Sequence, residues 1–408
     1  MPQRFVIIGN GIAGTTAAEV LKQEAPNSQV LLVGREKYPL YNRVSLPRYL
    51  KAGIPRERVI LRTVEQHKER GIDLELERVA TALDVEGKTV HFDDGSERPY
   101  DALMICTGGR PNPYPAPGAD DLRDKIYGFQ TLDDTDAINE KVMQSKAAVA
   151  VGGSFIAYEL AEGFRHRGLD TYWIMRGPWF LRYILDEDGA KMVDFLAREA
   201  GVEMLYNTEI ARVDAENGHI GVHTNSGRDI SADLLGYGLG LKMYDEWIED
   251  TGIDHNNGIE VDEYLETSIK GIYSGGDIAR FTDLLLDGRK NQMGTWDNSE
   301  AHGKVIAQNM LGGRVAHRDV PTYTTTMFNS NLAVMGITPD TGVELEKVTK
   351  LDIENRLYRA LFFYKGRLAG AVLIGTPKGR KKLIAMMEEQ VTVVPEEREK
   401  LLDPLNLV

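Results

Sequence analysis

Cysteine is nearly absent from this chain, because Cys106 is the only one among its 408 residues. A single cysteine excludes an intrachain disulfide, a redox-active cysteine pair and a zinc site built from several cysteines. Long apolar runs are also missing, since no stretch reaches the roughly 20 residues that a membrane-spanning helix needs. The eight histidines show no HExxH motif or similar ligand spacing. The sequence therefore predicts neither a membrane span nor a metal site.

Positive charge is scarce as well. Lysine and arginine number 48 against 62 aspartates and glutamates, which gives a formal net charge of −14. Because nucleic-acid binding requires a basic surface, this balance argues against a nucleic acid as partner. An acidic protein partner stays open, since a local basic patch can exist on an acidic molecule. The length predicts two or three domains, and the composition is ordinary for a globular enzyme.

A short apolar segment at residues 5–8 ends abruptly in the glycine-rich stretch of residues 9–14, and a helix-forming segment follows. This abrupt end predicts a strand rather than the apolar region of a signal peptide, so the cytoplasm is the expected location. In a dinucleotide-binding turn, Gly9 makes the tight turn, Gly11 admits the pyrophosphate and Gly14 lets the helix pack closely. The pyrophosphate then rests on free N–H groups at the helix start, where Ile12 and Ala13 lie.

A carboxylate follows the next predicted strand, at residues 29–33. Glu36 lies roughly 20 residues past the last glycine, where a residue that binds a ribose is expected. Because Glu36 stands slightly beyond the strand end, it is either that ligand or a solvated charge.

A second apolar strand, at residues 147–151, leads into a stretch spaced like the first turn. Gly152, Ser154 and Ala157 take its three special positions, and alanine is an accepted variant at the third. Ser154 departs from the pattern, because its side chain stands where backbone should meet the pyrophosphate. The other candidate ligands of this turn are Gly153, Phe155 and Ile156.

The strand predicted after this second turn, at residues 171–175, ends in Arg176 rather than in an acid. An arginine there favours the 2′-phosphate of NADP, whereas a carboxylate favours NAD. Either the turn binds NAD(P)H, or the domain has lost tight nucleotide binding. Two such turns in one chain predict two nucleotides that exchange electrons, and FAD with NAD(P)H is the natural pair.

Four further motifs follow one another along the chain, at residues 100–111, 233–240, 258–277 and 296–301. They resemble, in order, the YDxLhhATGxxP strand, the return strand, the second FAD motif and the WxNA helix start of the pyridine nucleotide–disulfide oxidoreductase superfamily. The resemblance implies an α/β fold of the glutathione reductase-like architecture. This has two Rossmann-like dinucleotide-binding domains and an α+β C-terminal interface domain.

The resemblance also implies domain boundaries. An FAD-binding domain is expected at residues 1–111 and 236–315, an NAD(P)-binding domain at 112–235 and an interface domain at 316–408, which usually forms homodimers. Family members hold FAD with residues that match positions outside the first turn as well. In this chain they are Arg43 and Arg110 near the pyrophosphate, Asp277 on the ribityl chain, Trp296 beside the isoalloxazine, and Val79, Thr107 and Gly108.

Residues 41–50 resemble the YxRxxLSKxxL segment of rubredoxin reductases, oxygenase-type ferredoxin reductases and the flavin part of assimilatory nitrite reductase. Related peroxidases and NADH oxidases carry a catalytic cysteine nearby, where this chain offers Val44 and Ser45, so the resemblance implies no thiol chemistry. The lysine of ferredoxin reductases falls on Arg48, and its glutamate partner near the flavin matches Glu159. Arginine keeps the charge but releases no proton, so Arg48 is either part of a catalytic pair or a surface charge.

The function implied is electron transfer from NAD(P)H through FAD to a rubredoxin- or ferredoxin-like carrier protein. Two alternatives stay open: a flavoprotein that reduces a quinone or sulfur compound, and a redox-responsive FAD-binding subunit with weak NAD(P)H turnover. The basic residues proposed as a carrier docking patch, or as a merely solvated face, are Arg43, Arg48, Lys51, Arg56 and Arg58.

Overall fold

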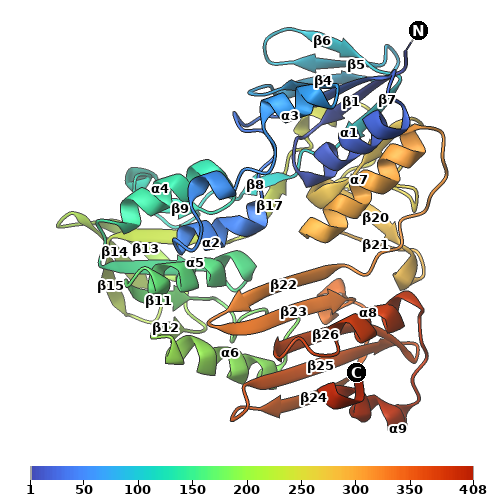
Figure 1. Ribbon diagram of the computed structural model, residues 1–408. Helices are drawn as coiled ribbons and strands as arrows, with labels where there is room; N and C mark the ends of the chain where they lie inside the picture. Colours follow the sequence, from blue (N-terminus) through green and yellow to red (C-terminus); the bar gives the residue numbers. More distant parts are fainter. Residues whose placement is uncertain (1, 408) are drawn as a thin grey trace. The chain divides into compact units, whose positions relative to one another are not determined.

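The computed structural model describes residues 2–407 (Figure 1). The chain forms two compact units, each built from several segments. The first contains residues up to 42, 57–110 and 242–322, and the second contains residues 43–56, 111–241 and those from 323 onward. The predicted division into three domains is a different partition of the chain and stays a prediction.

A five-stranded parallel sheet forms the centre of the first unit. Its strand order is β19-β7-β1-β2-β3. The strands are β1 (Arg4–Ile8), β2 (Gln29–Val33), β3 (Ile72–Glu75), β7 (Ala102–Ile105) and β19 (Ile272–Ser274). Uninterrupted apolar runs form β1 and β7, because both faces of such a sheet are buried.

Two helices of the first unit, α1 (Ile12–Glu24) and α7 (Trp296–Met310), pack against each other (Figure 1). Gly303 permits their close approach, since a Cβ there would lie 2.4 Å from the carbonyl oxygen of Ala13. The unit is completed by α3 (Val64–Glu69) and two antiparallel sheets. The first of these sheets contains β4 (Ala80–Asp84), β5 (Thr89–Phe92) and β6 (Glu97–Pro99). The second pairs β20 (Ala279–Asp283) with β21 (Arg289–Asn291), and the short strand β18 (Ile259–Glu260) runs parallel to β20.

A second five-stranded parallel sheet lies in the second unit, in the order β12-β11-β10-β16-β9. Its strands are β9 (Ile126–Gly128), β10 (Ala147–Val151), β11 (Asp170–Ile174), β12 (Val202–Leu205) and β16 (Leu234–Tyr237). The helices of this part are α2 (Leu46–Leu50), α4 (Leu132–Val142), α5 (Phe155–His166) and α6 (Glu187–Glu199). Two βαβ-type parallel sheets in one chain confirm the predicted α/β class.

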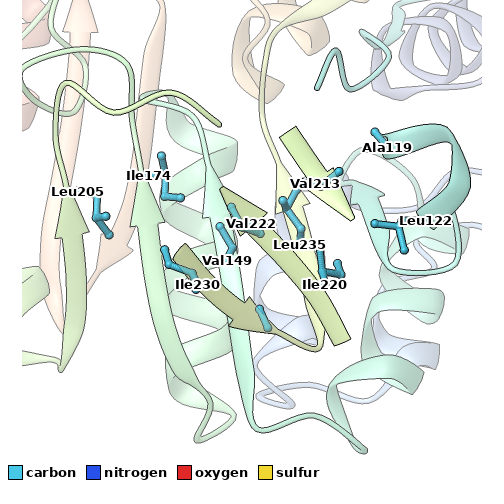
Figure 2. Packing of buried hydrophobic residues seen from close by; sticks show 11 residues of the cluster. Ala119, Leu122, Val149, Ile174, Leu205, Val213, Ile220, Val222, Ile230 and Leu235 are labelled. Atoms are coloured by element: carbon cyan, nitrogen blue, oxygen red, sulfur yellow. The ribbon is translucent and has the colours of Figure 1, made fainter. Parts of the chain in front are cut away.

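An antiparallel sheet packs on the parallel sheet of the second unit. It contains β13 (Ile210–Glu216), β14 (His219–Thr224) and β15 (Asp229–Ala232). Figure 2 shows Val149 and Leu235 of the parallel sheet close to Val222 and Ile220 of β14. This apolar layer fixes the strands that carry the second glycine turn.

The C-terminal part of the second unit is a five-stranded sheet in the order β22-β23-β26-β25-β24. Its elements are β22 (Thr322–Met327), β23 (Ser330–Gly336), β24 (Glu346–Asp352), β25 (Leu357–Tyr364), β26 (Arg367–Gly375), α8 (Arg380–Glu388) and α9 (Pro395–Arg398). Lys365 and Gly366 join β25 to β26 with positive φ angles of 49° and 78°, which is a two-residue hairpin turn. The short strands β8 (Gly109–Pro111) and β17 (Leu241–Met243) contain two of the five points at which the chain passes between the units.

Candidate active site

The first glycine turn lies between β1 and α1, and two of its glycines are required by the packing of the protein itself. Gly9 has a φ of +122°, and a Cβ there would lie 2.2 Å from the carbonyl oxygen of Cys106. At Gly14 a Cβ would lie 2.0 Å from the carbonyl oxygen of Gly9. These positions therefore have the roles predicted for them, the tight turn and the close helix–strand contact.

Gly11 is not required by the packing of the protein. Its φ of −70° suits any residue, and a Cβ there would meet no protein atom within 4 Å. The lack of a side chain thus leaves open surface in front of α1. This helix has no side-chain cap and no acid in its first turn, so the N–H groups near Ile12 and Ala13 stay available to an anion. The residues present fit the pyrophosphate of FAD.

Cys106 packs behind the same turn. Its Sγ donates to the carbonyl oxygen of Gly9 across 3.2 Å, and desolvation raises the pKa of the thiol far above its ordinary value. A neutral thiol in this place fills space as a small apolar group and is a poor nucleophile.

Three further predicted FAD residues of the first unit follow β7: Thr107 and Gly108 in the loop after it, and Arg110 in β8. Thr107 donates from Oγ1 to the carbonyl oxygen of Tyr244 across 3.1 Å, and Gly108 has a φ of +61° with open space at its Cβ position. Arg110 pairs with Glu246 at 2.6 Å. These bonds fix the loop that follows β7.

Two carboxylates predicted to bind FAD are held by neighbours. Tyr41 donates its phenol to Glu36 Oε2 across 2.7 Å. Asp277 follows Gly276, whose N–H donates to Nδ1 of the buried His302 across 3.1 Å. Burial lowers the pKa of His302 well below its ordinary value, so its neutral ring can accept this bond. His302 lies on α7 and is a positioning residue that the sequence did not reveal.

The remaining FAD candidates have these surroundings. Trp296 begins α7 and is partly exposed. The N–H of Val79 donates to Asp93 Oδ1 across 3.1 Å. Arg43 belongs to the second unit, where its guanidinium donates to the carbonyl oxygen of Gln130 across 2.8 Å. Their predicted contacts with FAD stay predictions.

The second glycine turn lies between β10 and α5. Gly152 has a φ of +129°, and a Cβ there would lie 2.4 Å from the carbonyl oxygen of Gly238. The buried indole of Trp173 donates to the carbonyl oxygen of Gly152 across 2.8 Å. Gly153 is exposed, and its Cβ position has no neighbour closer than 3.9 Å. The tight turn is therefore preserved.

Ser154, the departure from the glycine pattern, is the N-cap of α5, as Gly11 is of α1. Its Oγ donates back to the carbonyl oxygen of Gly238 across 3.2 Å. Because the hydroxyl is bonded to the carbonyl oxygen of Gly238, it makes no capping bond with the N–H groups in the first turn of α5, near Phe155 and Ile156. The serine is thus compatible with an anion at this helix start.

Arg176 follows β11 with its side chain 73% exposed. Its Nε lies 3.7 Å from Glu209 Oε1. An exposed guanidinium in this place can meet a 2′-phosphate, although Glu209 competes for the same charge. The choice between NADH and NADPH stays a prediction.

A polar network surrounds Glu159 on α5. Tyr323 donates its phenol to Glu159 Oε1 across 2.9 Å. The Tyr323 oxygen lies 3.2 Å from that of Tyr158, which donates to Thr325 Oγ1 across 2.8 Å. Desolvation raises the pKa of Glu159 to about 7, and the charge of Glu162 adds to the rise. The Tyr323 bond and the Lys51 charge oppose it, so Glu159 exchanges a proton near neutral pH.

The cation nearest to this network is not the predicted one. Lys51 pairs with Glu162 at 2.8 Å, and its charge acts on Glu159. Arg48 is exposed, and within residues 2–407 its side chain has no hydrogen bond or ion pair. The structure therefore does not bring Arg48 and Glu159 into contact, and their pairing stays a prediction. Tyr323 lies 164 residues from Glu159, so no local pattern signals it.

Residues 2–407 contain neither a membrane-spanning helix nor a group of metal ligands. No helix within residues 2–407 is long and apolar enough to cross a membrane. In the same part of the chain, no three His, Cys, Asp or Glu side chains are grouped as metal ligands.

Residues 3–303 match the family model described as pyridine nucleotide-disulphide oxidoreductase. The chain belongs to this family. Its members use FAD and NAD(P)H, which are the predicted cofactors, and the predicted superfamily is confirmed.

Among curated proteins, nitrite reductase [NAD(P)H] of Bacillus subtilis is 26% identical over 99% of this chain and 49% of its own length. The chain thus spans about half the length of the curated relatives that it matches first. The ferredoxin–NAD(+) reductase subunit of the benzene 1,2-dioxygenase system of Pseudomonas putida is 27% identical over 100% of this chain and 97% of its own. Among solved structures, a covalent putidaredoxin reductase–putidaredoxin complex matches with a TM-score of 0.91 at 23% identity, covering 98% of this chain and 96% of the other. This last likeness concerns the fold alone.

Proposed function

We propose that this protein oxidises NAD(P)H and passes the electrons, through FAD, to a small one-electron carrier protein of the ferredoxin or rubredoxin type. The observation that carries the proposal is the combination of two dinucleotide turns with Cys106 as the only thiol. Without a second cysteine, a reduced flavin cannot pass its electron pair to a dithiol of this chain. The dioxygenase ferredoxin reductase relative, matched over nearly its whole length, supports a carrier as acceptor.

FAD, when bound, supplies the conversion of a two-electron donor into a source of single electrons. The glycine turns of residues 9–14 and 152–157 provide two helix starts that bind pyrophosphates. Phe155 begins α5 and stacks on Tyr323 with ring centroids 4.1 Å apart, which fixes the side chain at the predicted nicotinamide end. The chain's own contribution is thus placement of two nucleotides.

The proton that NAD(P)H oxidation releases gives Glu159 a role in the proposed reaction. NAD(P)H releases two electrons and one proton, whereas a carrier of the proposed type accepts electrons only, so the proton must leave. A carboxyl group whose pKa is about 7 can take up and release a proton at neutral pH. We assign the carboxyl group of Glu159, whose Oε1 accepts from the phenol of Tyr323, as the group that holds this proton.

A carrier would dock on basic surface near α2 and the loop that follows it. Arg48 and Lys51 supply positive charge there, although Lys51 is already paired with Glu162. Encounters of this kind are small and electrostatically guided, so they weaken at high salt. A homodimer, as usual in this family, is part of the proposal and can be tested by sedimentation.

The test is anaerobic stopped-flow spectroscopy of the flavin-loaded protein. We expect NADH or NADPH to bleach the flavin within a second, and a [2Fe–2S] ferredoxin or a rubredoxin to reoxidise it. Reoxidation by menadione or polysulfide but by neither carrier would show a small-molecule reductase instead. Failure of both nucleotides to reduce the flavin would show a binding subunit without this activity.

A further inference from the structure

A cavity of about 700 Å³ lies within the second unit, apart from both glycine turns. Its walls come from α2, from the side of α5 that carries Tyr158 and Glu162, from residues 324–326 of β22 and from the start of α8. None of its lining residues belongs to residues 9–14 or 152–157. The volume falls within the range of roughly 300–1,000 Å³ that is typical of small-molecule sites.

The lining of this cavity is strongly basic. Its cations are Arg48, Lys51, Arg380, Lys381 and Lys382, and among residues 2–407 its single carboxylate is Glu162. Lys51 and Glu162 neutralise each other at 2.8 Å. Within residues 2–407, the other four cationic side chains form no hydrogen bond or ion pair. Four like charges around one concave surface repel one another and favour an anion.

The sequence of α8 adds a second argument. Arg380, Lys381 and Lys382 are its first three residues, and this first turn contains no acid. The free N–H groups of a helix start carry partial positive charge, so cations there are unfavourable. Three cations in this place therefore destabilise the protein when no ligand is bound. A bound anion beside them would offset this unfavourable interaction. Locally unfavourable sequence of this kind is typical of functional sites.

A buried arginine stands behind the same wall. Arg359 is fully buried in β25 and donates from Nη2 to the carbonyl oxygen of Lys378, across 3.0 Å. Lys378 lies between Pro377 and Gly379, which both line the cavity. The Nε and Nη1 groups of Arg359 have no hydrogen-bond partner within residues 2–407. Desolvation lowers the pKa of Arg359, and the charge of Asp403 opposes this shift. The buried guanidinium lies behind the cavity wall and adds to its positive potential.

We propose that this cavity binds a small polyanion with at least two phosphate-like negative charges, in the size range of a nucleoside diphosphate or a phosphorylated metabolite. Arg48 and Arg380 offer planar guanidinium groups that suit phosphate oxygens, and Lys381 and Lys382 act as point charges at the rim. The hydroxyls of residues 324–326 supply neutral donors. The proposal does not depend on the identity of the electron acceptor.

The experiment is calorimetric titration of the flavin-loaded protein with inorganic tripolyphosphate at low salt. Flavin occupies the first glycine turn, and saturating NAD⁺ blocks the second. We expect one site per chain, with affinity that falls as salt rises. The double variant Arg380→Gln/Lys382→Gln is expected to weaken binding roughly tenfold, because each lost exposed charge removes a modest part of the attraction.

Lys350→Gln is the matched control, because Lys350 is an exposed lysine of β24 outside the cavity. It should leave tripolyphosphate binding unchanged. Thermal unfolding without ligand should be alike in all three proteins, which separates a lost site from a damaged fold. Absence of binding, binding that NAD⁺ abolishes, or equal affinity in the double variant would each overturn the proposal. So would a double variant that weakens only an acidic carrier protein, since the cavity would then be a docking surface.

Discussion

The phenol of Tyr323 donates to Glu159 Oε1 across 2.9 Å, and this bond joins α5 to the C-terminal sheet of the second unit. This bond stabilises the carboxylate form and works against the desolvation that raises the pKa of Glu159. Tyr158, on the same helix, continues the network toward Thr325. The titration of Glu159 therefore depends on a residue that the sequence motifs do not include.

Tyr323→Phe should raise the pKa of Glu159 above its value of about 7, because the variant removes a donor to the carboxylate. The carboxyl stretching band in infrared difference spectra should then disappear at a higher pH than in the parent protein. The exposed Tyr183→Phe is the matched control and should leave the band's pH dependence unchanged. An equal or lower titration midpoint in Tyr323→Phe would contradict this assignment.

Glu159→Gln should stabilise the protein at pH 8 but not at pH 4. The pKa of Glu159 is about 7 in the folded chain, against an ordinary value of 4.5. Below pH 4.5 the carboxyl group is protonated in both the folded and the unfolded chain, so it does not lower the free energy of unfolding. As pH rises from 4.5 to 7, only the unfolded chain loses the proton, and folding becomes less favourable. Because Glu159 is partly exposed, the free energy of unfolding of Glu159→Gln at pH 8 should exceed that of the parent protein by only roughly 1–3 kcal/mol.

Denaturant unfolding of the apoprotein at both pH values measures this gain. Glu162→Gln gives the contrast, because Glu162 accepts from Lys51 and from the N–H of Phe328, each across 2.8 Å. Loss of that paired charge should destabilise the protein at pH 8. A Glu159→Gln variant that is less stable at pH 8 would contradict the raised pKa.

Two glycines of the first turn should respond to alanine in opposite ways. Gly11→Ala places its Cβ in open space at an ordinary φ, so the apoprotein should gain up to about 0.5 kcal/mol. FAD affinity should nevertheless fall at least tenfold, since the methyl group occupies the expected pyrophosphate surface. Gly14→Ala brings its Cβ within 2.0 Å of the Gly9 carbonyl oxygen and should destabilise the apoprotein by roughly 1–3 kcal/mol.

Apoprotein unfolding and titration with FAD separate the two effects. If Gly11→Ala binds FAD as tightly as the parent protein, the pyrophosphate does not lie against this residue, and the placement of FAD is wrong.

The sequence predicts the elements of this fold better than the contacts of its candidate site. The strands expected at residues 29–33 and 147–151 have those bounds in the structure, because uninterrupted apolar runs are followed by glycine. By contrast, β22 and β23 are separated by Phe328 and Asn329, which both have positive φ angles. Asn329 tolerates a positive φ angle whereas Phe328 does not favour one, so the local signal for this turn is weak.

The side-chain partners of the candidate site depend on tertiary structure. The bond between Lys51 and Glu162 joins residues 111 positions apart, and no spacing rule connects them. The resemblance instead indicated Arg48, which lines the basic cavity without a partner within residues 2–407. The orientation of Ser154 likewise depends on the carbonyl of Gly238, at the end of a strand far along the chain. Motifs predict which backbone holds a nucleotide, whereas the charges around it follow from packing.

Arg176→Glu should shift the preference of the second turn from NADPH toward NADH. The Arg176 guanidinium is exposed at the end of β11, where a 2′-phosphate would meet it, and a carboxylate there would repel the phosphate and accept from a free ribose hydroxyl. We expect the ratio of kcat/KM for NADPH over NADH, measured by flavin reduction, to fall at least tenfold. Glu209→Gln should move the same ratio the other way, because it removes the carboxylate that lies 3.7 Å from Arg176. A ratio that neither variant changes would show that Arg176 takes no part in choosing the nucleotide.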